Sequence, residues 1–103
     1  MEDTMTYEVV LFRAKTGVSR DELISAFAAT QAIIENFDGF IKRTLLEGEN
    51  GQWIDMVQWQ SLAQAQTAAE KVMQMPELAQ SFAVIDESTI QMLHLHDVAL
   101  VTG

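Results

Sequence analysis

Residues 40–60 read FIKRTLLEGENGQWIDMVQWQ, and this stretch decides the fold. Two apolar-rich runs, Phe40–Glu47 and Gln52–Gln60, flank a short loop that contains Asn50 and Gly51. Asparagine and glycine both tolerate positive φ angles, which the two central residues of a type I′ turn require. The stretch therefore predicts a β-hairpin.

The residues before the hairpin predict a strand followed by a long helix. Tyr7–Lys15 is rich in β-branched and aromatic residues, as strands are. Ser19 and Glu22 have the spacing of a capping box, so a helix is expected over Arg20–Phe37. Gly39 then allows the left-handed conformation in which helices often end.

The residues after the hairpin predict a second helix and a last strand. Ser61–Met75 is rich in alanine and has helical spacing, and Pro76 closes it. A short helical segment is expected within Glu77–Ala83. Ile85–Thr89 is interpreted as a linker into a final strand, Thr89–Val98.

This order of elements predicts an α+β, ferredoxin-like βαββαβ fold, with two helices on one face of a four-stranded antiparallel sheet. The whole chain, 1–103, is expected to form one domain with its core at about residues 7–98. Both sheet faces are largely apolar, yet the helices cover only one. A homodimer that packs the open sheet face against its twin is therefore expected.

Composition excludes several partners. The net charge is −9, and only six residues are Lys or Arg, scattered along the chain. Nucleic acids and anionic membranes call for a basic surface, so neither is expected as a partner. The chain has no cysteine, no apolar run of membrane-spanning length and no signal-peptide pattern at its start, which together favour the cytoplasm.

Mid-strand polar residues mark a candidate site. Asp55 lies between two tryptophans in an apolar run, and His94 lies in the last strand. In the usual strand order, 4-1-3-2, Arg13 of the first strand would lie between them. We expect His94 to act as a base, Asp55 to orient it and Arg13 to stabilise negative charge. The expected substrate-binding residues are Trp53, Trp59 and Met92.

The location and role of this site have alternatives. The small side chains of the second helix favour a cavity between that helix and the sheet, and the rival location is inside a dimeric barrel. The tryptophans and His94 also fit a structural role in the core. His94 and His96 share a strand face, but no recognised metal-ligand spacing includes them, so no metal is expected.

The layout over Tyr7–Val98 resembles the dimeric α/β barrel superfamily, and within it the antibiotic-biosynthesis-monooxygenase-like domains. The matching segments are Val9–Gly17 before an acidic helix start, Phe37–Phe40 at the second strand, and Trp53–Ser61. The last segment, continued by Leu62, is similar to the family's tryptophan-plus-helix-start element.

This resemblance implies several functions, among them cofactor-free oxygenases of polycyclic aromatics, haem-degrading enzymes and isomerases. Haem-degrading members use a histidine in or after the second helix, and residues 61–89 contain neither histidine nor tryptophan. The expected function is therefore a cofactor-independent monooxygenase or isomerase acting on a small apolar or aromatic molecule. The alternative is a non-catalytic dimeric binding or accessory domain, in which the tryptophans fill the core and leave no cavity.

Overall fold

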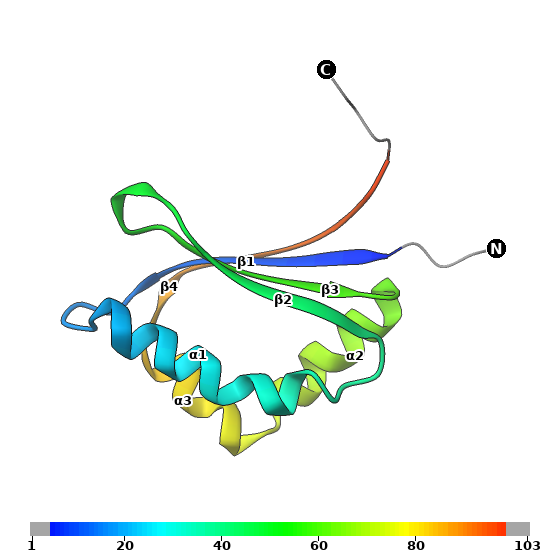
Figure 1. The fold of residues 1–103 in the computed structure, drawn as a ribbon, viewed down its shortest axis with the longest axis horizontal. Coiled ribbons are helices and arrows are strands. Elements are labelled where there is room, and N and C mark those ends of the chain that lie inside the picture. Colours follow the sequence, from blue (N-terminus) through cyan, green and yellow to red (C-terminus); the bar gives the residue numbers. More distant parts are fainter. Residues whose placement is uncertain (1–4, 99–103) are drawn as a thin grey trace.

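The structure is a computed structural model that describes residues 5–98. Its four strands are β1 (Thr6–Ala14), β2 (Phe40–Glu47), β3 (Trp53–Trp59) and β4 (Ile85–His96). They form one antiparallel sheet in the order β2-β3-β1-β4, which confirms the predicted topology. The helices α1 (Arg20–Ile34), α2 (Leu62–Met73) and α3 (Ala79–Ala83) all lie on one side of this sheet (Figure 1).

Local sequence signals explain the start of α1 and the hairpin. The Ser19 hydroxyl accepts a hydrogen bond from the Glu22 amide, and the Glu22 carboxylate accepts one from the Ser19 amide, which confirms the capping box. Asn50 and Gly51 both have positive φ angles, 60° and 80°, as a type I′ turn requires. The hairpin therefore forms where the sequence predicts it, with the short 3-10 turn η1 (Glu49–Gly51) in its loop.

Two helix boundaries differ from the prediction. Helix α1 ends at Ile34 and not at Phe37, because the Phe37 amide bonds the carbonyl three residues back and tightens the last turn. Helix α2 begins one residue after Ser61, whose hydroxyl caps it by accepting from the Gln64 amide. The segment after Pro76 forms the 3-10 turn η2 (Pro76–Leu78) followed by α3.

The last strand begins earlier than expected. Ile85–Thr89 was expected to form a linker, but β4 starts at Ile85. Ile85 pairs with Ala14 and Asp86 with Arg13 beyond an irregularity in the ladder. Pairing with β1 and burial of Ile85, which is 4% exposed, thus extend the strand toward α3.

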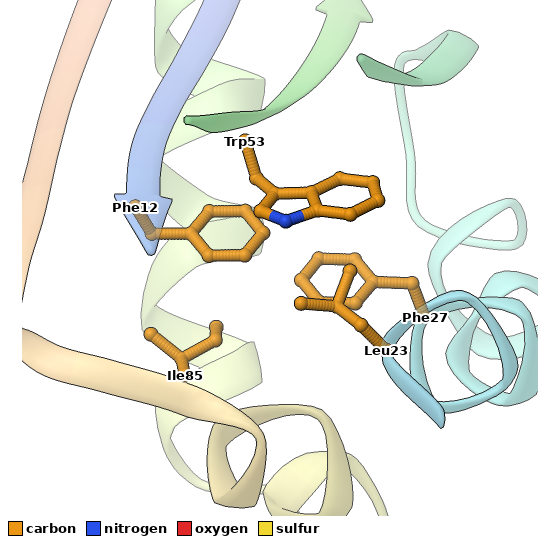
Figure 2. Close-up of a cluster of buried hydrophobic side chains, with 5 residues drawn as sticks. All are labelled: Phe12, Leu23, Phe27, Trp53 and Ile85. Atoms are coloured by element: carbon orange, nitrogen blue, oxygen red, sulfur yellow. The ribbon is translucent and has the colours of Figure 1, made fainter. Parts of the chain in front are cut away.

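The core between sheet and helices contains two clusters. In the first, side chains from β1, α1, β3 and β4 point toward one another (Figure 2). The Phe12 and Phe27 rings stack with centroids 5.2 Å apart. The second cluster is built on Trp59 and Val57 of β3, against Ala65 and Ala68 of α2. No helix within residues 5–98 is long and apolar enough to cross a lipid bilayer.

Candidate functional site

A cavity of about 480 Å³ lies between the sheet and the three helices. Its wall is mostly apolar and includes residues of β1, β3, β4 and all three helices. Ala68 and Ala69 of α2 line this space, and their short side chains occupy little of it. The favoured location of the site, under the helices, thus contains a cavity of the size that small molecules occupy. An accessory domain with a closed core does not fit this arrangement.

Strand register decides which polar side chains reach the cavity. Val10 of β1 pairs with Asp55 on one side and Met92 on the other, and Glu8 pairs with Val57 and His94. Residues that pair directly share a sheet face. Glu8, Val10 and Phe12 therefore face the helices, together with Asp55 and Met92, and all five line the cavity.

Arg13 does not join this group, and the prediction that it lies between Asp55 and His94 is wrong. Arg13 directly follows Phe12 in β1, so the two side chains point to opposite faces of the sheet. Arg13 is exposed, and its guanidinium donates to the carbonyl of Asn50 in the hairpin loop. Alternation along the strand therefore directs Arg13 away from the helix side.

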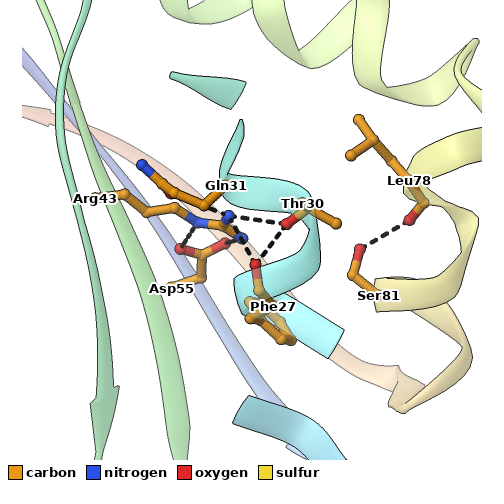
Figure 3. Close-up of polar contacts among 7 residues, drawn as sticks. All are labelled: Phe27, Thr30, Gln31, Arg43, Asp55, Leu78 and Ser81. Carbon is orange, nitrogen blue, oxygen red and sulfur yellow. Dashed lines mark hydrogen bonds and ion pairs between the residues drawn. The ribbon is translucent and has the colours of Figure 1, made fainter. Parts of the chain in front are cut away.

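Arg43, and not Arg13, contacts Asp55. Its Nε and Nη2 atoms donate to the two carboxylate oxygens of Asp55, each at 3.0 Å (Figure 3). The side chains are only 8% and 15% exposed. Arg43 Nη1 donates to the Thr30 hydroxyl at 2.9 Å, and the guanidinium lies over the Phe27 ring, 5.3 Å from its centroid. This network ties β2 and β3 to α1.

His94 contacts Glu8 and not Asp55, so the expected Asp55–His94 pair is absent from the described residues. The His94 Nε2 atom lies 3.3 Å from Glu8 Oε2. Glu8 lines the cavity and is 11% exposed, whereas His94 is 24% exposed and lies outside the cavity wall. Burial raises the pKa of Glu8 above its ordinary value, although contact with His94 and the Trp59 indole acts in the opposite direction.

The two tryptophans have different surroundings. Trp53 packs in the first core cluster and does not line the cavity, so its expected role in substrate binding is not supported by its position. Trp59 lines the cavity and is 2% exposed. Its indole N–H lies close enough to Glu8 to lower the pKa of that carboxyl, but it makes no hydrogen bond of good geometry within the described part of the chain. A buried donor without a partner is costly, so this N–H is available to donate to an oxygen atom of a bound molecule.

Glu8 and Arg43 are the residues that sequence analysis missed. Glu8 shares parity with Val10 and Phe12, so an acidic residue on the apolar face of β1 was the signal that would have found it. Arg43 was ambiguous, because Lys42 and Arg43 place a charge on each face of β2. Within residues 5–98, no three His, Asp or Glu side chains gather in a way that would hold a metal ion.

No protein-family model matches the chain, and no curated protein matches it significantly in sequence. Solved structures do match it over nearly its whole length. A candidate antibiotic biosynthesis monooxygenase from Bordetella bronchiseptica has a TM-score of 0.80 at 13% identity, covering 94% of this chain and 100% of that one.

Two further structures are described by different activities. SnoaB, a cofactor-independent oxygenase from Streptomyces nogalater, has a TM-score of 0.65 at 20% identity, covering 96% of both chains. The haem-degrading protein Rv3592 from Mycobacterium tuberculosis has a TM-score of 0.69 at 20% identity, covering 99% of this chain and 100% of that one. At such identities the likeness concerns the fold, and fold does not choose between activities. The chain has the fold of the antibiotic-biosynthesis-monooxygenase-like proteins.

Proposed function

We propose that this protein is a cofactor-independent monooxygenase that binds a small apolar or aromatic molecule in the cavity under its helices. One observation carries the proposal. The buried carboxylate of Glu8 lies on the wall of an apolar cavity and contacts His94 behind the wall, and Trp59, on the same wall, has an indole N–H without a hydrogen-bond partner among the described residues. Apolar walls with a few polar groups are typical of small-molecule sites, and a carboxyl group with a raised pKa suits a general base.

Proton removal from the bound molecule is the first proposed step. Glu8 takes a proton from an acidic C–H of the ligand, and His94, behind it, receives a hydrogen bond or passes the proton outward. The raised pKa of Glu8 makes its carboxylate a stronger base than one in water. The negative charge moves from Glu8 to the ligand, so the total charge of the cavity does not change.

Reaction with dioxygen is the second proposed step. The carbanion gives electrons to dioxygen, a C–O bond forms, and loss of water leaves a carbonyl group. A methylene group and one dioxygen molecule thus become one carbonyl and one water, with dioxygen as the only oxidant. If the proton returns to a different carbon instead, the same first step gives an isomerisation.

The other side chains have supporting roles in this proposal. Trp59 and Met92 form part of the cavity wall, as expected from the sequence, and Trp59 is the proposed donor to a ligand oxygen. Asp55 pairs with Arg43 and does not orient His94, because both of its carboxylate oxygens accept hydrogen bonds from the Arg43 guanidinium. The pair holds β2 and β3 against α1 and so fixes the shape of the cavity.

The test is a ligand screen with two readouts. Polycyclic aromatic compounds with an acidic C–H are titrated against tryptophan fluorescence, and compounds that bind are then assayed for oxygen uptake without added flavin or metal. We expect saturable quenching, oxygen uptake, and loss of uptake but not of binding in E8Q and H94A. Binding without oxygen uptake or isomerisation for every compound would instead support the non-catalytic binding domain.

A homodimer is part of the proposal, through the face of the sheet that no helix covers (Figure 1). The register places Val9, Leu11, Ile54 and Met56 on this open face, with the exposed leucines of β2 and β4. The leucines at positions 46, 93 and 95 are 40–47% exposed in a single chain. A second copy is the partner that gives this surface a matching apolar cover. The cytoplasm remains the proposed location.

A further inference from the structure

The charges on the cavity wall are unevenly divided. Among the residues that line it, three carry carboxylates, namely Glu8, Asp55 and Glu70, and one, Arg43, carries a guanidinium. An uncharged ligand meets no penalty from this arrangement. An anionic ligand would need a free positive charge on the wall to offset its loss of water.

Arg43 does not supply that free charge. Its Nε and Nη2 atoms donate to Asp55, and its Nη1 atom donates to the Thr30 hydroxyl (Figure 3). Its charge is therefore neutralised within the protein by a carboxylate that accepts two hydrogen bonds. A carboxylate ligand would have to compete with Asp55 for the same donors.

His94 does not supply it either. It lies 3.3 Å from Glu8 and outside the cavity wall. When His94 is neutral, the ionised Glu8 faces the cavity with a net negative charge. When His94 is protonated, Glu8 neutralises it. In neither state does the wall present an uncompensated cation.

We infer that Glu8 makes this cavity selective for uncharged apolar ligands and excludes their carboxylates. The inference rests on the proposed function in one respect, namely that the cavity binds a ligand. It also agrees with the proposed first step, because the anion arises inside the cavity only as Glu8 becomes neutral. An anion that arrives from water while Glu8 is ionised meets a second negative charge on the cavity wall.

The experiment compares two probes of nearly the same shape, 2-naphthamide and 2-naphthoate, by isothermal titration at pH 7. In the cavity, the carboxylate of 2-naphthoate would lie several ångströms from that of Glu8. At an effective dielectric constant of about 20, the repulsion between two such charges weakens binding by a factor of tens. We therefore expect the wild-type protein to bind 2-naphthamide at least about tenfold more tightly than 2-naphthoate. E8Q should bind 2-naphthoate about tenfold more tightly than the wild type does, and 2-naphthamide within about threefold of it.

E70Q is the matched control, because it removes the same charge from an exposed residue of the same cavity wall. It should leave the ratio of the two affinities unchanged. Equal binding of both probes to the wild type would overturn the inference, and so would an unchanged ratio in E8Q, while the proposed function would stand. If neither probe binds, ligand binding in the cavity is refuted and the inference with it. Equal binding of the two probes by the wild type overturns the inference even if E8Q does not fold.

Discussion

Asp55 accepts both of its charge-assisted hydrogen bonds from Arg43, a residue twelve positions earlier on the neighbouring strand. Directly paired residues are Leu45 and Asp55, so the guanidinium reaches diagonally along the helix-covered face. The same guanidinium also bonds Thr30 of α1. One buried ion pair thereby connects the hairpin to the helix layer.

Breaking this pair is predicted to destabilise the protein strongly. D55N leaves the buried Arg43 charge without its partner, which costs about 3–5 kcal/mol in comparable sites. Urea unfolding measures the loss. The control is R20Q, which breaks the Arg20–Glu47 pair, where the side chains are 63% and 43% exposed. That variant should leave the unfolding midpoint nearly unchanged. Equal effects of the two substitutions would contradict the structural role of Asp55.

Glu8 is predicted to make stability depend on pH. Its pKa in the folded protein is raised above its ordinary value of 4.5, chiefly by burial. Between these two pKa values the folded protein binds more protons than the unfolded chain, so its stability falls as pH rises. E8Q lacks this proton, and its stability relative to the wild type should increase from pH 4.5 upward and then level off. Urea unfolding of both proteins between pH 4 and 8 tests this, and a constant difference would show that Glu8 titrates normally.

Filling the cavity is predicted to block ligand binding without unfolding the protein. Ala69 lines the cavity from α2, so A69F places a ring in the space that a ligand would use. We expect at least a tenfold loss of affinity for 2-naphthamide, because a large part of the apolar contact area is lost. A63F, at an exposed position of the same helix, is the control and should bind normally. Normal binding by A69F would place the ligand elsewhere.

The open sheet face is predicted to hold two copies together. L93K puts a charge on this face, in the edge strand β4, and should convert a dimer to a monomer in sedimentation equilibrium at micromolar concentration. L62K is matched in exposure, 46% for both leucines, but lies on α2, away from that face. It should leave the dimer intact. A wild-type monomer would show that no second copy covers the sheet.

Local signals made much of the fold predictable. The Ser19–Glu22 capping box, the Asn50-Gly51 turn and Pro76 each act over a few residues, and each is found where the sequence places it. The order of elements and the usual connections of a βαββαβ unit then restrict the sheet to one topology. The start of the last strand was less predictable, as residues 85–89 show, because pairing with β1 decides where β4 begins.

The partners within the site were not predictable from period-two patterns alone. Alternation correctly divides the side chains of β1 between the two sheet faces. Only the pairing of β1 with β3 shows that Val10, and not Arg13, lies beside Asp55. In β2 the pairing with β3 shifts by one residue between Phe40 and Lys42. Each later side chain of β2 therefore points to the sheet face opposite to the one that alternation from Phe40 predicts. A bulge of this kind leaves no sequence signal, so Arg43 remained ambiguous until its strand was placed.

The central claim is that a small apolar molecule binds in the cavity against Trp59. The chain has two tryptophans, and a ¹⁵N-correlated NMR spectrum of their indole N–H groups reports on each. During titration with 2-naphthamide, we predict a large, saturable shift of the Trp59 signal, identified by its loss in W59F, and a smaller shift of the Trp53 signal. Two indole signals that stay unmoved while the ligand binds, or a ligand that does not bind, would contradict the claim.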